Sequence, residues 1–327
     1  MPVLREKENN NMSKMGFEEF KNEVVGRVLD FLPESFRGAE VGLNVVTKPN
    51  DIKLTGLTIR KAGSNIAPTI YLEEFYSQIE SGDNFSLVMK RIADVRIAHE
   101  VEDVDLETIL DFNNCKDRIL PRLYGSEMNR EVCNNRVYTK IEDFVVMYIV
   151  DMGVVSDGTM SIPIDSKIIE AWGISIAELH QIAIENQHSR HKGTLKTMFE
   201  VMKDLLYPEM LNDMDGDEEM ADAMFGQMFS TPGGEMYIIS NESNFNGSSM
   251  ILDSEFMNKV AEKIGGEFYI LPSSIHEVIA VPKSEVLDTE YLATMVYEIN
   301  RSQVAESDRL SDHVYTYTRE NGLVRVA

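Results

Sequence analysis

The residue types of a nucleophilic catalytic site lie together in one short stretch, between two apolar runs. Ser273, Ser274, His276 and Glu277 all belong to the connection that follows Pro272. A hydroxyl, an imidazole and a carboxylate are the groups that serve hydrolases as nucleophile, general base and orienting partner. Ser274, His276 and Glu277 are therefore the catalytic candidates, and a hydrolase-like enzyme is one function that the sequence allows.

The same stretch also has a structural interpretation. Catalytic triads are normally assembled from distant chain segments, because neighbouring side chains on a tight turn rarely point to one place. The sequence contains no Gly-x-Ser-x-Gly nucleophile elbow. In this interpretation Ser273 and Ser274 form hydrogen bonds with backbone groups of a hairpin. His276 then caps the turn or packs against it. We favour the turn and assign no catalytic residue.

Three histidines form a second candidate site. His180, His188 and His191 are spaced by eight and three residues, and Glu185 lies three positions before His188. One helical face could present all four, and imidazoles with a carboxylate suit zinc or another transition metal. The neighbouring Arg190 opposes a cation, and positive side chains are typical of a helix C-terminus because they favour its dipole. We therefore expect no metal and no cofactor.

Negative charge is concentrated in the last third of the chain. The 327 residues carry a net charge of −24, and residues 201–327 contribute 8 basic against 23 acidic side chains. Such a field repels phosphate backbones, which argues against direct binding of nucleic acid there. These acidic side chains either form a solvated surface that keeps the protein soluble or recognise a basic partner. An acidic inhibitor of a nucleic-acid-binding protein is a further alternative, although residues 1–100 are almost neutral.

Methionine is dense in the same acidic part. Of 19 methionines in the chain, six lie between Met210 and Met236, beside the acidic run that begins at Asp213. Flexible thioethers beside carboxylates form an adaptable docking surface, unless they fold back as a lid on their own domain. The run is not an EF-hand, because Gly216 stands at position four rather than six. Residues 207–234 are predicted to be a mobile loop.

The elements that position these residues predict an α+β fold with mixed or antiparallel sheets and flanking helices. Apolar periodicity predicts helices over 17–32, 72–79, 85–99, 253–264 and 288–301, and another with the stripe Leu195, Met198, Met202 and Leu205. Ser175 and Glu178 predict a capping box at the start of a further helix. Strands are predicted over 41–46, 52–59, 67–72, 119–124, 144–150, 161–164, 236–240, 249–252, 268–271, 278–281, 314–318 and 323–326.

Two domains are expected from the order of these elements. The sequence predicts a flexible tail over 1–14, an α+β domain over 15–103 and a larger α+β domain over 104–327. No apolar run reaches the roughly 18 residues of a membrane span. No signal peptide is recognisable, and two cysteines exclude a disulfide framework. A cytoplasmic protein is the expectation.

Three stretches resemble an uncharacterised family. They are 174–186, 236–249 and 268–282, within a likeness that covers roughly 15–320. The family resembled belongs to Gram-positive gut bacteria, often occurs among genes of mobile elements, and is a domain of unknown function. The resemblance implies no catalytic residues. The expected function is therefore that of a binding or accessory protein rather than an enzyme. Its acidic C-terminal half is expected to contact another protein. Direct binding of nucleic acid and of membranes is not expected.

Overall fold

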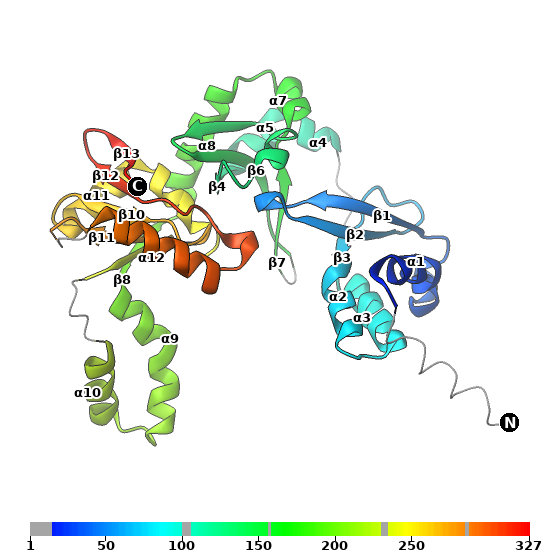
Figure 1. Cartoon of the computed structure of the whole chain (residues 1–327). Coiled ribbons are helices and arrows are strands. Elements are labelled where there is room, and N and C mark those ends of the chain that lie inside the picture. Colours follow the sequence, from blue (N-terminus) through cyan, green and yellow to red (C-terminus); the bar gives the residue numbers. More distant parts are fainter. Residues whose placement is uncertain (1–14, 100–105, 156–157, 230–234, 285–287) are drawn as a thin grey trace. The chain divides into compact units, whose positions relative to one another are not determined.

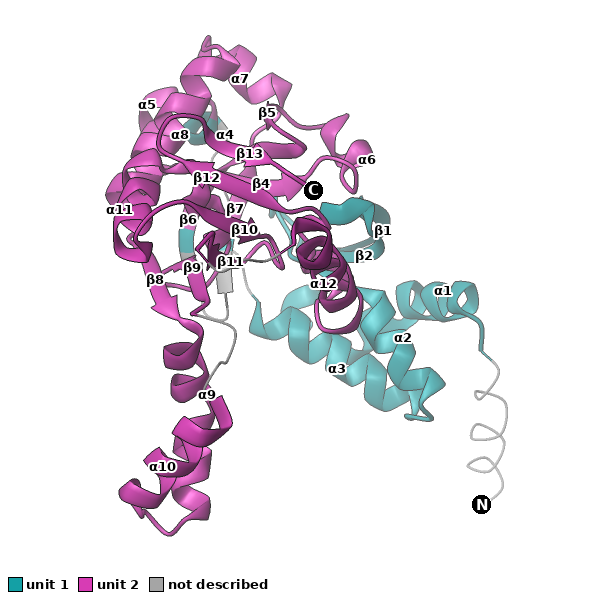
Figure 2. Cartoon of the chain, turned by 60° about the vertical axis from the view of Figure 1, so that its left-hand side comes forward, with its two compact units in different colours: residues 1–109, 153–160 teal, residues 110–152, 161–327 magenta. Residues whose placement is uncertain are grey.

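The computed structural model describes residues 15–99, 106–155, 158–229, 235–284 and 288–327 (Figure 1). The predicted tail over 1–14 lies outside the described residues. The chain divides into two compact units, which are residues 1–109 with 153–160 and residues 110–152 with 161–327 (Figure 2). All three sheets are antiparallel in their described pairings and are accompanied by helices, which confirms the α+β class.

The first unit is a three-stranded antiparallel sheet with helices. Its strands are β1 (Glu40–Thr47), β2 (Lys53–Arg60) and β3 (Thr69–Tyr71), and its helices are α1 (Phe17–Arg27), α2 (Leu72–Glu80) and α3 (Phe85–Ala98). Alternation in β2 buries Leu57 and Ile59. They join Phe20 and Val24 of α1 and Ile92 of α3 in one apolar core. The predicted helix over 17–32 ends earlier, because a 3₁₀ turn follows α1.

The second unit contains a six-stranded sheet and most of a four-stranded sheet, whose residues 153–160 are assigned to the first unit. The six-stranded order is β13-β12-β10-β11-β9-β8, and in the other sheet β4, β6 and β5 are neighbours while β7 pairs with β6. The strands are β4 (Ile119–Gly125), β5 (Tyr138–Ile141), β6 (Phe144–Val155), β7 (Gly158–Pro163), β8 (Gly193–Thr197), β9 (Tyr237–Asn241), β10 (Phe268–Leu271), β11 (Val278–Pro282), β12 (Tyr315–Thr318) and β13 (Gly322–Arg325).

Most of the remaining helices begin at a residue whose side chain caps the first turn. In the predicted capping box the Ser175 hydroxyl accepts the Glu178 backbone N–H at 3.2 Å, and the Glu178 carboxylate accepts that of Ser175 at 2.8 Å. Each such cap contributes about 1 kcal/mol. These helices are α4 (Leu106–Leu110), α5 (Phe112–Cys115), α6 (Arg130–Cys133), α7 (Ser166–Trp172), α8 (Ile176–Arg190), α9 (Met198–Asp213), α10 (Glu218–Phe229), α11 (Ser254–Ile264) and α12 (Thr289–Ser302).

Three local predictions are wrong. Leu195 belongs to β8 and pairs with Ile239, so the helix begins only after Thr197, which forms a second capping box. Residues 249–252 lie in a 3₁₀ helix instead of a strand, because the Ser248 hydroxyl donates to the carbonyl of Ile275 at 2.7 Å. Residues 207–229 are mostly helical, whereas the sequence predicts a loop.

Among the described residues, every helix is too short or too polar to cross a membrane.

Candidate functional site

The Ser274 hydroxyl acts within the turn that connects β10 to β11. Its oxygen accepts the backbone N–H of His276 at 2.8 Å, and Ser274 is 7% exposed. The His276 Nδ1 atom accepts the backbone N–H of Asn246 at 3.2 Å. In the neutral ring the proton must then sit on Nε2, which lies 3.9 Å from a carboxylate oxygen of Asp308. This ring therefore has no free lone pair to take a proton from Ser274.

The three catalytic candidates nevertheless line one open pocket. Ser274, His276 and Glu277, together with Asp308, border a cavity of about 340 Å³. A ligand of modest size would fit this volume. The imidazole that would serve as base uses its Nδ1 lone pair to accept from Asn246, so the three side chains share a pocket without forming a nucleophile–base pair.

The metal candidates point to different neighbours. The His180 Nδ1 atom contacts the Tyr148 hydroxyl at 3.0 Å, and burial lowers the pKa of His180. Glu185 accepts a hydrogen bond from Gln181. His188 contacts Asp253 instead. In the described part of the chain, no three or more His, Cys, Asp or Glu side chains are placed to hold a metal ion.

His188 belongs to a charged dyad that the sequence did not indicate. Its Nδ1 atom lies 2.7 Å from Oδ2 of Asp253, and this hydrogen bond raises the pKa of His188. Asp253 is 4% exposed and also caps α11, since its Oδ1 atom accepts the Phe256 backbone N–H at 3.0 Å. The sequence predicted the helix over 253–264, but the pairing of Asp253 with a residue 65 positions away is a tertiary contact.

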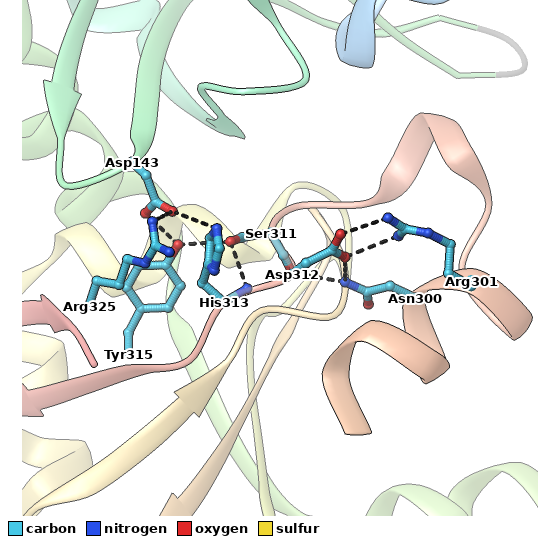
Figure 3. A network of polar contacts seen from close by, with 8 residues as sticks. All are labelled: Asp143, Asn300, Arg301, Ser311, Asp312, His313, Tyr315 and Arg325. Carbon is cyan, nitrogen blue, oxygen red and sulfur yellow. Dashed lines mark hydrogen bonds and ion pairs between the residues drawn. The ribbon is translucent and has the colours of Figure 1, made fainter. Parts of the chain in front are cut away.

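A second network, shown in Figure 3, is a directed chain of hydrogen bonds. The Asp143 carboxylate accepts from the Tyr315 hydroxyl. The Tyr315 oxygen must then accept from Ser311 at 2.8 Å, and the Ser311 oxygen accepts the His313 backbone N–H at 3.1 Å. Arg325 adds an ion pair to Asp143 at 3.4 Å. Such a chain polarises each bond in turn and stabilises the arrangement.

The role of this network is to stabilise the fold. Burial, and then the hydrogen bond to Asp143, raise the pKa of Tyr315, so its phenol stays protonated. The adjoining cavity, which Asp143, Ser311 and His313 line, holds only about 40 Å³. That space is far below the few hundred Å³ of typical ligand pockets. Sequence reasoning missed the network because its members lie far apart in the chain.

The α9–α10 hairpin is held together by aromatic contacts. Phe225 of α10 is 1% exposed, and its ring centroid lies 5.2 Å from that of Phe199 and 5.9 Å from that of Tyr207, both on α9. Figures 1 and 2 both show the two helices side by side. All residues of α9 are described, and none is buried. The hairpin therefore packs against itself and leaves much apolar surface in solvent.

Three methionines form the outer face of α10. Met220, Met224 and Met228 recur at four-residue steps and are 59%, 42% and 56% exposed. Residues at this spacing share one face of a helix. Ala221 and Phe225 occupy the buried face. We call Met220, Met224 and Met228 the methionine face.

The hairpin that carries the methionine face is strongly acidic. Residues 198–229 contain nine Asp and Glu and a single basic residue, Lys203, which gives a net charge of −8. Lys203 pairs with Asp222 at 2.9 Å. The hairpin therefore combines exposed thioethers with a strong negative field.

Comparison with protein families gave one match. The model described as "Family of unknown function (DUF5688)" matches residues 17–319. The chain belongs to this family. Neither the curated proteins nor the solved structures contain a match. The expected resemblance to a family of unknown function is thereby confirmed.

The DUF5688 match includes the main features described above. It spans the hairpin of α9 and α10, the His188–Asp253 dyad and the Tyr315 network except for Arg325. The family description assigns no activity. The function of this DUF5688 protein therefore has to be argued from side chains and their environments.

Proposed function

We propose that this DUF5688 protein binds another protein through the methionine face, and that the bound segment is a basic amphipathic helix. The observation that carries the proposal is the coincidence of three exposed methionines on one helical face with a hairpin charge of −8. Helices with one apolar face commonly dock on exposed apolar surfaces. Cations beside that apolar face would meet the carboxylates of the hairpin.

The apolar part of the interaction is large enough to matter. Full burial of one methionine side chain contributes roughly 1.5–3 kcal/mol. Much of the sum is offset by lost translational freedom and side-chain ordering on association. Met220, Met224 and Met228 adapt to partners of different shape, because thioether chains are unbranched and polarizable. The exposed Leu205 and Leu206 of α9 extend the apolar surface available on the hairpin.

The charge sets the class of partner. A negative field speeds the approach of a basic segment and disfavours acidic ones. It also opposes direct binding of nucleic acid, whose phosphates carry the same sign. Added salt should weaken the charged part of the interaction, because the Debye length falls to about 8 Å at physiological ionic strength.

Several finer expectations belong to the same proposal. The protein acts in the cytoplasm of a Gram-positive gut bacterium, away from membranes, and its gene lies among those of a mobile element. A partner whose basic segment also binds DNA would make the protein an acidic inhibitor. In that case DNA and this protein would compete for the partner, and the competition would weaken at high salt. Such a result would identify the protein as an inhibitor of this kind.

The proposal is tested with a synthetic leucine–lysine peptide patterned as an amphipathic helix of about 18 residues, because shorter helices are marginal in water. Calorimetric titration compares the full chain with the Met220→Ser, Met224→Ser, Met228→Ser variant. The variant keeps every charge. We expect its affinity to fall by at least about tenfold, equivalent to 1.4 kcal/mol.

A matched control separates this face from exposed apolar surface in general. Tyr291 and Tyr297 on α12 are 62% and 51% exposed, so Tyr291→Ser with Tyr297→Ser removes comparable side chains elsewhere. The control variant should bind the peptide as the wild type does. Equal affinity of wild type and methionine variant would contradict the proposal, because the acidic surface alone would then account for binding.

A hydrolase is the second candidate function. Its support is the single pocket shared by Ser274, His276 and Glu277. A serine-reactive fluorophosphonate that labels the full chain but not its Ser274→Ala variant would favour it. Equal labelling, or none, would leave the turn interpretation in place.

A further inference from the structure

A pocket lined by three lysines lies in the acidic second unit, at the His188–Asp253 dyad. Residues of β8, of α11 and of the end of α8 enclose a cavity of about 460 Å³. Leu195, Phe256 and Val260 supply apolar lining. Lys192, Lys259 and Lys263 line the same space. Cavities of this size with an apolar lining and few polar groups are typical of small-molecule sites.

The gathering of lysines is unusual for this part of the chain. Residues 201–327 contain only eight basic side chains, and two of them, Lys259 and Lys263, line the pocket. With Lys192 they place three ammonium groups around one cavity. A compact anion can receive hydrogen bonds from several such groups at once, and charge-assisted bonds of this kind are strong.

Each lysine has a weak partner that a ligand can replace. Lys259 contacts Glu255 at 2.8 Å, and Lys192 lies 3.8 Å from Glu242. The Lys263 ammonium lies 3.4 Å from the carbonyl oxygen of Leu195. The two ion pairs are exposed, and such pairs contribute little to stability. An incoming dianion would therefore displace little stabilisation.

The His188–Asp253 dyad supplies a positioned imidazole at the same pocket. Asp253 fixes the ring through Nδ1 and is itself fixed by the Phe256 backbone N–H. His188 and His191 both line the cavity. The Nε2 atom of His191 is buried and has no hydrogen-bond partner among the described residues. Buried polar atoms are rarely left without a partner, so this atom is an exception next to the pocket.

The apolar wall depends on a glycine. A Cβ atom at Gly193 would lie 2.5 Å from the Phe256 ring, so any side chain there would displace the ring. The bare backbone of Gly193 lets this ring lie against β8. The wall and the lysines together suit a ligand with one apolar and one doubly charged end.

We propose that this pocket binds a small organic phosphate monoester, with the phosphate held by Lys192, Lys259 and Lys263 and the organic group against Phe256 and Val260. The site is independent of the methionine face. Phosphate is favoured over carboxylate because three ammonium groups and an imidazole can satisfy a dianion with three terminal oxygens.

Phenyl phosphate is the probe, and isothermal titration of the full chain is the measurement. It should bind at least about tenfold more tightly than inorganic phosphate or phenol, because only phenyl phosphate uses both parts of the pocket. The double variant Lys259→Gln, Lys263→Gln should lose at least about tenfold in affinity. The control Lys283→Gln removes a lysine that also pairs with a glutamate, at 2.8 Å from Glu267, but lies outside the pocket. It should bind as the wild type does.

Two results would overturn the site. One is equal affinity of the wild type and the double variant for phenyl phosphate. The other is phenyl phosphate binding no more tightly than inorganic phosphate, which would mean that the apolar wall takes no part. The methionine-face variant should bind phenyl phosphate unchanged, so failure here is distinguishable from failure of the peptide-binding proposal.

Discussion

The Tyr315 hydroxyl donates a hydrogen bond to the Asp143 carboxylate, although 172 positions separate the two residues. Asp143 lies in the turn between β5 and β6, and Tyr315 begins β12. The bond therefore ties the four-stranded sheet to the six-stranded sheet within the second unit. Because Tyr315 and Ser311 are both buried, loss of the Tyr315 hydroxyl would leave the Ser311 O–H without an acceptor away from water.

Tyr315→Phe should destabilise the second unit. Removal of the hydroxyl leaves the Asp143 carboxylate and the Ser311 hydroxyl each short of one hydrogen bond. An unsatisfied buried polar group costs about 1–3 kcal/mol, and more when it is charged. Urea unfolding followed by circular dichroism measures the loss.

Tyr317→Phe is the matched control. The Tyr317 hydroxyl donates only to neutral acceptors, including Oδ1 of Asn258 at 3.2 Å. Its loss should cost only about 0.5–1.5 kcal/mol. Equal destabilisation by both variants would contradict a special role for the Asp143–Tyr315 bond.

The His188–Asp253 dyad gives a prediction for titration. The hydrogen bond that His188 donates to the Asp253 carboxylate raises the pKa of His188 above its ordinary value near 6.5. Asp253→Asn removes the negative charge but keeps a good N-cap for α11. The titration midpoint of the His188 ring, measured by NMR, should therefore fall in the variant. The midpoint of His180 should stay unchanged, since burial and not Asp253 lowers its pKa.

The same dyad gives stability a pH dependence. The pKa of His188 is raised in the folded state. The stability that the dyad contributes is therefore complete below the unfolded-state pKa of about 6.5, and it is lost as the pH rises through the folded-state pKa. Wild-type stability should fall over that window relative to His188→Gln. The comparison uses urea unfolding at a series of pH values. Parallel curves for the two proteins would show that the dyad contributes no linkage.

Phe225→Ala should open the α9–α10 hairpin without unfolding the sheets. The ring is 1% exposed and provides the aromatic contacts between the two helices. Truncation of a buried phenylalanine costs about 3–5 kcal/mol. Hydrogen exchange should accelerate over 198–229 and remain slow in β9, β10 and β11.

Met224→Ala is the control for the hairpin. This side chain is 42% exposed, and surface substitutions usually change stability by less than about 0.5 kcal/mol. Hydrogen exchange in the hairpin should then match that of the wild type. Acceleration by Met224→Ala as large as that by Phe225→Ala would show that the two faces of α10 are not distinct.

Local chemistry explains what the sequence predicted well. The capping box of Ser175 and Glu178 is complete within four residues, so α8 could be placed from its first turn. Alternating apolar residues likewise located β2, because alternation alone determines which side chains of a strand are buried. The hairpin of β12 and β13 follows from two short strands around Asn321.

Long-range partners explain what the sequence did not predict. The strand predicted over 249–252 is wrong because the Ser248–Ile275 hydrogen bond that holds the 3₁₀ turn joins distant parts of the chain. The loop predicted from residue 207 is wrong because α9 continues through Pro208 and packs on Phe225. Asp253 caps α11 locally, but its partner His188 lies 65 positions away.

The most direct test of the methionine face is NMR of the chain labelled at its methionine methyl groups. On titration with the leucine–lysine peptide, the methyl signals of Met220, Met224 and Met228 should shift together. The signals of the buried Met89 and Met257, both 0% exposed, should stay in place. Peptide binding that leaves the three exposed methionines unshifted would contradict the proposed function.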